Sequence, residues 1–165
     1  LYFGVVVMGM IFTLGAVSGA HMNPAVSIAF WSIGKLTFKR LLTYIPFQLL
    51  GALLASLTLM VLFPNQKNYG ETVPQGTWEQ SFLMEFILSL FLMLVIIFHA
   101  TGGKEKGITA AIAIGFSVFI CALVGGPISV ASMNPARTFG PAIVSGNNTH
   151  FWLYVVAPIF AMLLH

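Results

Sequence analysis

Charged residues are scarce in this sequence. Lys, Arg, Asp and Glu together make up 7% of its 165 residues, whereas 58% of the residues are hydrophobic. Soluble domains carry roughly 25% charged residues. So little charge excludes an ordinary soluble domain and predicts a chain that lies in a membrane.

Several features that would indicate particular functions are also missing. A single cysteine, Cys121, stands inside an apolar block, so the chain has no disulfide framework. The seven Lys and Arg residues do not form the clustered basic patch that binds nucleic acid. The sequence contains no metal-ligand spacing, no nucleophile–base pair and no phosphate-binding loop. We therefore expect no enzyme activity, no cofactor, no bound metal and no nucleic-acid partner.

What the sequence does contain is a series of apolar blocks. A helix of about 17 to 25 residues crosses the hydrocarbon of a bilayer, and the blocks do not show the alternation of a β-barrel strand. The chain is thus predicted to be an all-α membrane protein. Five spans, wholly or partly present, are expected at 1–17, 41–63, 81–100, 108–124 and 151–165. Two further runs, 24–33 and 135–144, are too short to span, and Gly125-Gly126-Pro127 is expected to end the fourth span.

Two stretches of the chain are copies of one another. The stretches 18–25 and 129–136 align without a gap, and both end in Met-Asn-Pro-Ala, so that Asn23 and Asn134 lie 111 residues apart. Three complete spans separate the two motifs. An odd number of spans places the motifs on opposite faces of the membrane, so the repeat is inverted.

The repeat defines the expected organisation of the chain. One membrane domain, 1–165, comprises an incomplete first repeat (1–63), an external loop (64–80) and a second repeat (81–165) truncated at its last helix. By the offset, we expect the chain to be a fragment that lacks one preceding helix and the end of the last one. Five of the seven basic residues fall on one side, which is cytoplasmic by the positive-inside rule; they are Lys35, Lys39, Arg40, Lys104 and Lys106.

Each Asn-Pro-Ala motif has the chemistry of a helix start. Asparagine is a preferred N-cap, and proline fits the first helical position. A helix of about ten residues is about 15 Å long, half the hydrocarbon thickness, so two such half-helices meet near the midplane. Irregular backbone at that depth lines water or is buried by protein. A motif that merely starts a helix is the competing interpretation, and it is weak for two motifs in inverted halves.

The meeting of two helix N-termini predicts how such a path selects its solutes. Each N-terminus carries about half a positive charge, and the Asn23 and Asn134 amides can donate hydrogen bonds to a passing water. A water that accepts both bonds loses the orientation that a proton wire needs, and cations are repelled by the same field. The path therefore favours neutral molecules.

Two longer stretches are specific enough to suggest a family. They are Ser18-Gly19-Ala20-His21-Met22-Asn23-Pro24-Ala25-Val26 and Ser132-Met133-Asn134-Pro135-Ala136-Arg137. On these residues the chain resembles an aquaporin of the major intrinsic protein family, and Gly125-Gly126-Pro127-Ile128-Ser129 resembles nodulin-type members and their bacterial relatives. The resemblance implies six spans with two re-entrant half-helices, a homotetramer and a location in the cell membrane. It implies a pore midplane formed by Asn23, Pro24, Ala25, Asn134, Pro135 and Ala136.

The resemblance also implies an outer selectivity filter. Matching positions from each Asn gives Phe3, Ala122, Ala131 and Arg137. Strict water channels have a histidine at the position of Ala122, and alanine leaves a wider opening. Thr138 and Ala142 differ from the residues usual in glycerol facilitators, which favours the water-channel branch. The choice between water alone and water with small neutral solutes stays open.

Three further residues have competing interpretations. Glu85 lies within a span, so it could couple a proton to transport, or its carboxylate could accept backbone N–H bonds and hold a re-entrant loop; we expect the second. His21 could titrate, but we expect it to support its loop, where backbone groups need partners. Asn147-Asn148-Thr149 matches the glycosylation sequon on the external side.

The function predicted from the sequence is a passive channel for water and small neutral solutes such as glycerol, urea or ammonia, which excludes protons and ions. The alternatives are a glycerol or solute facilitator with secondary water transport and, from another class, an inverted-repeat secondary transporter.

Overall fold

The computed structural model describes residues 2–66, 68–101 and 106–164. Within these residues the chain is all helical, without strands. The helices are α1 (Tyr2–Ser18), α2 (Pro24–Ser32), α3 (Phe38–Leu62), α4 (Trp78–Thr101), α5 (Lys106–Ser129), α6 (Pro135–Ser145) and α7 (Leu153–Met162). The five predicted spans and both short runs are therefore confirmed as helices. Lys104, used above to assign the cytoplasmic side, and the terminal residues 1 and 165 lie outside the described residues.

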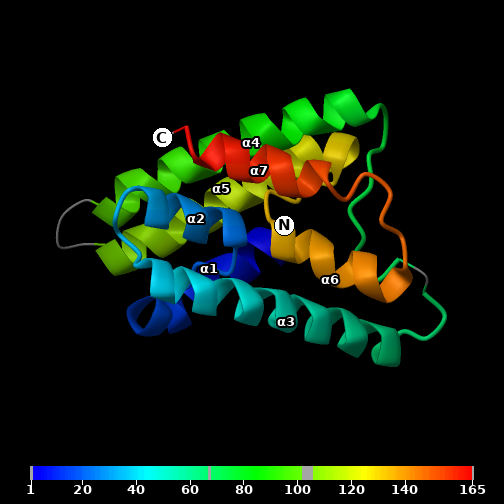
Figure 1. Cartoon of the computed structure of the whole chain (residues 1–165), viewed down its shortest axis with the longest axis horizontal. Coiled ribbons are helices and arrows are strands. Elements are labelled where there is room, and N and C mark those ends of the chain that lie inside the picture. Colours follow the sequence, from blue (N-terminus) through cyan, green and yellow to red (C-terminus); the bar gives the residue numbers. More distant parts are fainter. Residues whose placement is uncertain (1, 67, 102–105, 165) are drawn as a thin grey trace.

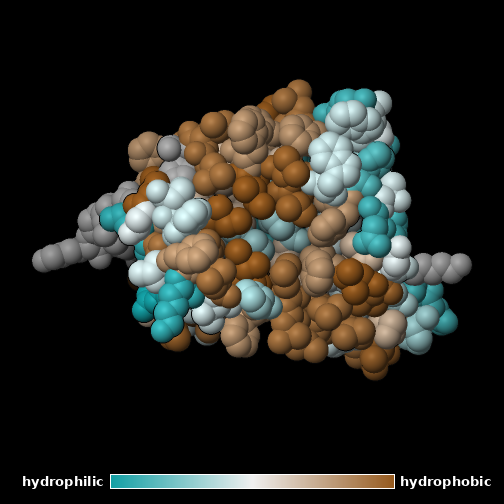
Figure 2. Space-filling model, viewed as in Figure 1, coloured by the Kyte–Doolittle hydropathy of each residue, from teal (hydrophilic) through white to brown (hydrophobic). Residues whose placement is uncertain are grey.

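The lengths and surface of the helices are those of a membrane protein. Three helical segments are long and apolar enough to cross a bilayer: Phe38–Leu62, Trp78–His99 and Ile108–Ser129, counted over the described residues. Helices α1 and α7 are apolar but shorter. Apolar side chains cover the middle of the molecule, and hydrophilic ones gather at its two ends (Figure 2). An exposed apolar band between polar ends suits a surface solvated by lipid.

The helices begin and end on the sides of the molecule that the odd number of spans between the two motifs predicts. Helices α2 and α4 end on the side of the molecule where α3 and α5 begin, whereas α3 and α6 end on the opposite side (Figure 1). The two short helices, α2 and α6, lie between the long ones and direct their N-termini toward each other (Figure 1). Helix α1 packs against α5, and α4 packs against both α5 and α7.

Glycines allow two of these helix pairs to approach closely. A Cβ added to Gly4 of α1 would lie 2.5 Å from the carbonyl oxygen of Gly115 in α5. Likewise, a Cβ added to Gly140 of α6 would lie 2.3 Å from the carbonyl oxygen of Ala52 in α3. Both neighbours are backbone atoms, so larger side chains would force the helices apart. This is the role that small residues play between helices in membranes.

The end of α5 differs from the sequence-based expectation. Gly125-Gly126-Pro127 was expected to end this helix, but α5 continues to Ser129 with Pro127 inside its last turn. The N–H of Val130 still donates to the Gly126 carbonyl at 3.1 Å. The helix thus continues through the glycine pair despite the weak helix propensity of glycine. Gly125 allows α4 to approach closely, since an added Cβ would lie 2.3 Å from Leu88 of α4.

Candidate functional site

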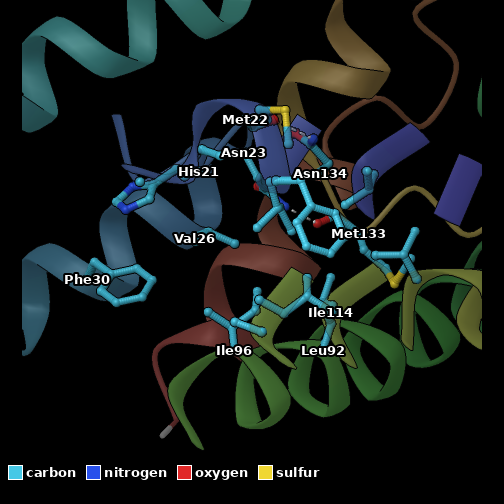
Figure 3. A pocket seen from close by; sticks show the side chains of 18 of the residues that line it. His21, Met22, Asn23, Val26, Phe30, Leu92, Ile96, Ile114, Met133 and Asn134 are labelled. Atoms are coloured by element: carbon cyan, nitrogen blue, oxygen red, sulfur yellow. Dashed lines mark hydrogen bonds between the residues drawn. The ribbon is translucent and has the colours of Figure 1, made fainter. Parts of the chain in front are cut away.

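A cavity of about 520 Å³ runs along the two Asn-Pro-Ala loops. Asn23 and Asn134 line it on one side, while Leu92, Ile96 and Ile114 from α4 and α5 line the opposite side (Figure 3). The wall is therefore mostly apolar, with polar groups concentrated where the two loops meet. A mostly apolar cavity with a few fixed polar groups is the usual form of a small-molecule site.

The two asparagines hold the ends of the half-helices and also join them. Asn23 Oδ1 accepts from the Ala25 N–H at 2.9 Å, and Asn134 Oδ1 accepts from the Ala136 N–H at 3.0 Å. Asn23 Nδ2 donates to the carbonyl of Met133 at 2.8 Å, and Asn134 Nδ2 donates to the carbonyl of Met22 at 2.8 Å. Each motif is thus capped by its own asparagine and bound to the other loop.

These reciprocal bonds refine the expected chemistry of the amides. A side-chain amide has two N–H donors, and at Asn23 and Asn134 one donor is used by the opposite loop. One N–H of each amide remains for the cavity. The hydrogen bonds already made, two by the Asn23 amide and three by the Asn134 amide, fix the plane of each group. The remaining N–H therefore has a set direction, which a freely rotating side chain would lack.

The backbone of the two loops follows one conformation twice. Gly19, Ala20 and Met22 have φ of 75°, 48° and 47°, and their repeat counterparts Val130, Ala131 and Met133 have φ of 66°, 47° and 52°. Left-handed backbone is uncommon outside glycine and is disfavoured most for a β-branched residue such as Val130. Strain of this kind persists where the surroundings fix the backbone.

The Glu85 carboxylate is one of the groups that fix the second loop. This side chain is fully buried in α4. Its Oε1 accepts from Ser129 Oγ at 2.7 Å and from the Ser132 N–H at 2.8 Å, and its Oε2 accepts from the Met133 N–H at 2.6 Å. Such charge-assisted bonds are the strong ones. These three bonds join α4 to the loop between α5 and α6.

In each copy, a side-chain contact also joins the loop to the first turns of the half-helix. Ser132 Oγ lies 2.6 Å from Thr138 Oγ1 in the second copy. At the corresponding positions of the first copy, His21 Nδ1 lies 3.1 Å from Ser27 Oγ. The His21 ring also stacks on Phe30 with centroids 4.8 Å apart. His21 thus makes the same contact in its copy as Ser132 makes in the other copy.

The residues assigned to the outer filter are only partly brought together. The Arg137 guanidinium lies 5.7 Å from the ring centroid of Phe3, and Arg137 Nη1 donates to the carbonyl of Gly70. Phe3 lines the cavity, whereas Ala122, Ala131 and Arg137 are not among its lining residues. Ala131 is buried beside Gly125, where an added Cβ would lie 3.3 Å from the Ala131 Cβ.

Several supporting residues were not found from the sequence. Gln48 Nε2 donates to Ser27 Oγ at 2.9 Å, and Thr72 Oγ1 donates to Thr138 Oγ1 at 2.8 Å. Tyr154 Oη donates to the carbonyl of Ser129 at 2.9 Å. None of these residues belongs to a motif, and their partners are distant in sequence, so no local signal marks them.

Comparison with known proteins places this arrangement among related sequences and folds. The profile of the family described as "Major intrinsic protein" matches residues 1–164. The chain is 44% identical over 160 residues to nodulin-26 of Glycine max, covering 96% of this chain and 59% of that protein. It is 47% identical over 161 residues to a probable NIP-type aquaporin of Nicotiana alata, covering 97% of this chain and 60% of that protein. The chain thus spans less than two thirds of the length of these relatives.

A solved structure has the same fold. The aquaglyceroporin of Plasmodium falciparum superposes with a TM-score of 0.86 at 26% sequence identity, covering 98% of this chain and 76% of that one. The similarity extends over nearly all of the described helices, including both half-helices.

Proposed function

The chain belongs to the major intrinsic protein family, and from this premise we propose that the protein forms a passive transmembrane channel for water and small neutral solutes. The observation that carries the proposal is the pair of Asn-Pro-Ala loops joined across the cavity. Asn23 and Asn134 both line it, and each keeps one amide N–H beyond those used between the loops.

The proposed selection acts through orientation and charge. A water that passes the pair accepts from the free amide N–H groups and turns its own hydrogens away from the centre. Both half-helix N-termini add positive potential at that point, so cations are repelled and the hydrogen-bonded chain of waters is interrupted. Leu92, Ile96 and Ile114 offer no hydrogen bonds opposite the amides, so the water cannot reorient against that wall (Figure 3).

The outer filter is proposed to consist of Phe3, Ala122, Ala131 and Arg137. The contact of the Arg137 guanidinium with the Phe3 ring supports this assignment. One wall then offers hydrogen-bond donors and another offers an aromatic face, while two alanines leave the remaining sides open. Such a filter suits small solutes with both a polar and an apolar side.

Stopped-flow measurements on proteoliposomes containing the protein at its natural length test the proposal. Permeability to water, and to at least one of glycerol, urea and ammonia, should exceed that of empty vesicles without any ion gradient. Proton and cation permeability should not rise. Uptake that saturates and requires a gradient would instead indicate a secondary transporter.

Two alternatives are distinguished by the same measurement. A facilitator in which glycerol outweighs water is favoured by Ala122, and the aquaglyceroporin of similar fold is a protein of that name. A secondary transporter would need a coupling site, and Glu85 is the residue that suggested one. Both of its oxygens accept hydrogen bonds from the loop. The carboxylate could therefore bind a coupling ion only if the loop moved away.

The assembly and location are part of this proposal. We infer a homotetramer with one pore in each subunit, in the cell membrane. The exposed apolar side chains of α1 and α3, among them Val5, Val17 and Phe47, support a surface that contacts lipid or further copies of the chain.

A further inference from the structure

The segment 68–77, here called the outer strap, connects α3 to α4 across the second half-helix. Gly70 of the strap accepts a hydrogen bond from Arg137 Nη1, and Thr72 Oγ1 donates to Thr138 Oγ1 at 2.8 Å. Both partners lie in the first turns of α6. Gly70 has φ of 88°, a backbone conformation that glycine adopts without strain. The strap therefore presents its carbonyl to the arginine of the proposed filter.

A side-chain pair fastens the strap at the far end of α6. Glu71 Oε2 accepts from Asn147 Nδ2 at 2.9 Å. Asn147 follows the C-cap of α6 at Gly146, and its own Oδ1 accepts from the Thr149 N–H at 3.1 Å. Both the amide nitrogen and the amide oxygen of Asn147, the asparagine of the glycosylation sequon, thus make hydrogen bonds within the fold.

We propose that Glu71 and Asn147 are positioning residues that set the selectivity of the pore through Arg137. This inference rests on the proposed function of the chain as a channel. Glu71 and Gly70 are neighbours, so a bond that fixes Glu71 also fixes the peptide whose carbonyl holds the guanidinium. The guanidinium in turn lies 5.7 Å from the centre of the Phe3 ring. Without the Glu71–Asn147 bond the strap shifts, Arg137 loses its fixed acceptor, and the filter admits larger neutral solutes.

Four variants distinguish a role of the Glu71–Asn147 hydrogen bond from a role of the Glu71 charge. Glu71→Gln removes the charge but keeps a side-chain oxygen that accepts from Asn147. Glu71→Ala removes the acceptor. Asn147→Asp keeps the acceptor for the Thr149 N–H but sets a carboxylate against Glu71. The double variant Glu71→Gln with Asn147→Asp restores the bond with donor and acceptor exchanged.

The test measures the ratio of glycerol to water permeability for each variant in proteoliposomes of the natural-length protein. Glu71→Ala and Asn147→Asp should raise the ratio about fivefold, the factor that corresponds to losing one hydrogen bond. Glu71→Gln and the double variant should stay near the wild-type ratio. The control is Glu79→Ala, which removes an exposed carboxylate from the first turn of α4 and should leave the ratio unchanged.

Several outcomes overturn the proposal. A ratio that stays constant or falls in Glu71→Ala, including equal loss of water and glycerol transport, shows a role in folding only. A Glu71→Gln ratio as high as that of Glu71→Ala shows an effect of charge. Failure of the double variant to restore the ratio contradicts the pairing.

A second measurement separates this proposal from the function of the channel. If the wild type conducts neither solute, the channel proposal fails, and amide hydrogen exchange of the strap still tests the pair. Exchange at the amides of residues 70–73 and 75 should accelerate in Glu71→Ala and return to the wild-type rate in the double variant. Equal exchange rates in all variants would reject the Glu71–Asn147 pair as the fastening of the strap.

Discussion

Glu85 shows how one buried side chain can determine the shape of a whole loop. Its two oxygens accept three hydrogen bonds from Ser129, Ser132 and Met133. A buried carboxylate is costly unless such donors surround it. In return, two backbone N–H groups at the left-handed turn obtain partners that the turn itself cannot supply.

Replacing this carboxylate with an amide should destabilise the protein. In Glu85→Gln the amide nitrogen must face at least one loop donor, which leaves that donor unsatisfied at a cost of about 1 to 3 kcal/mol. The free energy of unfolding, or the melting temperature in detergent, should fall, and water permeability should fall with it. Glu79→Gln, at an exposed site, is the control. An unchanged melting temperature would contradict the loop-support role.

Among the described residues, Val130 is the β-branched residue with left-handed backbone. Its φ of 66° is matched in the other repeat by Gly19 at 75°. Left-handed backbone costs a non-glycine residue about 1 to 2 kcal/mol. Replacing it with glycine removes this cost, but glycine has more freedom to lose on folding, which costs about 0.5 to 1 kcal/mol.

Val130→Gly is therefore expected to raise the stability of the folded protein by about 1 kcal/mol or less. The reverse exchange, Gly19→Val, should lower it, because an added Cβ also lies 3.3 Å from the His21 ring. Thermal unfolding of both variants in the same detergent checks the pair. A lower melting temperature for Val130→Gly would mean that the valine side chain contributes more by packing than its backbone costs.

At the scale of elements, the half-helices depend on close contact with the long helices. Gly140 of α6 lies against the backbone of Ala52 in α3, with no side chain between them. The distance between these helices decides where the N-terminus of α6, and hence Asn134, lies relative to the first loop.

Gly140→Ala should push the two helices apart. Its Cβ would lie 2.3 Å from the Ala52 carbonyl oxygen and 2.6 Å from the Ala52 carbonyl carbon, and overpacking of this kind typically costs about 1 to 3 kcal/mol. Thermal stability and water permeability are both expected to decrease. Gly126→Ala is the matched control, since no atom lies within 4 Å of its added Cβ. Equal effects of the two substitutions would show that a change in helix propensity, rather than the contact with α3, accounts for the effect of Gly140→Ala.

At the scale of the whole molecule, the proposed channel excludes ions at one place and selects among neutral solutes at another. In the proposed channel, the joined asparagines lie where the half-helices meet and favour neutral molecules of any kind. The proposed filter near Phe3 and Arg137 then chooses among neutral molecules by size and hydrogen bonding. Substitutions in these two places should therefore have different consequences for solutes.

Ala122→His tests that separation. A larger side chain with a hydrogen-bond donor should narrow the filter, so that glycerol and urea permeability fall while water permeability is largely retained. Ala122→Val adds bulk without a donor and serves as the comparison. If water and glycerol permeability decrease by the same factor in Ala122→His, residue 122 does not set the width of the filter.

Much of the fold follows from local features of the sequence. Asn-Pro at the start of each half-helix and the length of the apolar run after it predicted the short helices almost to the residue, because capping depends on neighbours in the chain. Block length and parity gave the long helices and the inversion. The predicted end of α5 was wrong, because the helix continues through the glycine pair to Ser129. Gly125 serves close packing against Leu88 of α4 rather than a helix end.

The candidate site was predictable in its parts but not in its connections. Asn23 and Asn134 were identifiable from the repeated motif alone. That each amide donates to the backbone of the opposite loop was not, since both bonds join residues more than one hundred positions apart. The same holds for Gly70, Thr72 and Glu71 of the outer strap.

The sequence by itself determined that this protein is a helical membrane protein with two inverted copies of one unit, because hydrophobic block length and helix capping are local properties. Only the tertiary structure decided which donors remain free in the cavity, how Glu85 holds the second loop, and how the outer strap reaches Arg137. Those features depend on distances between segments that only packing brings together.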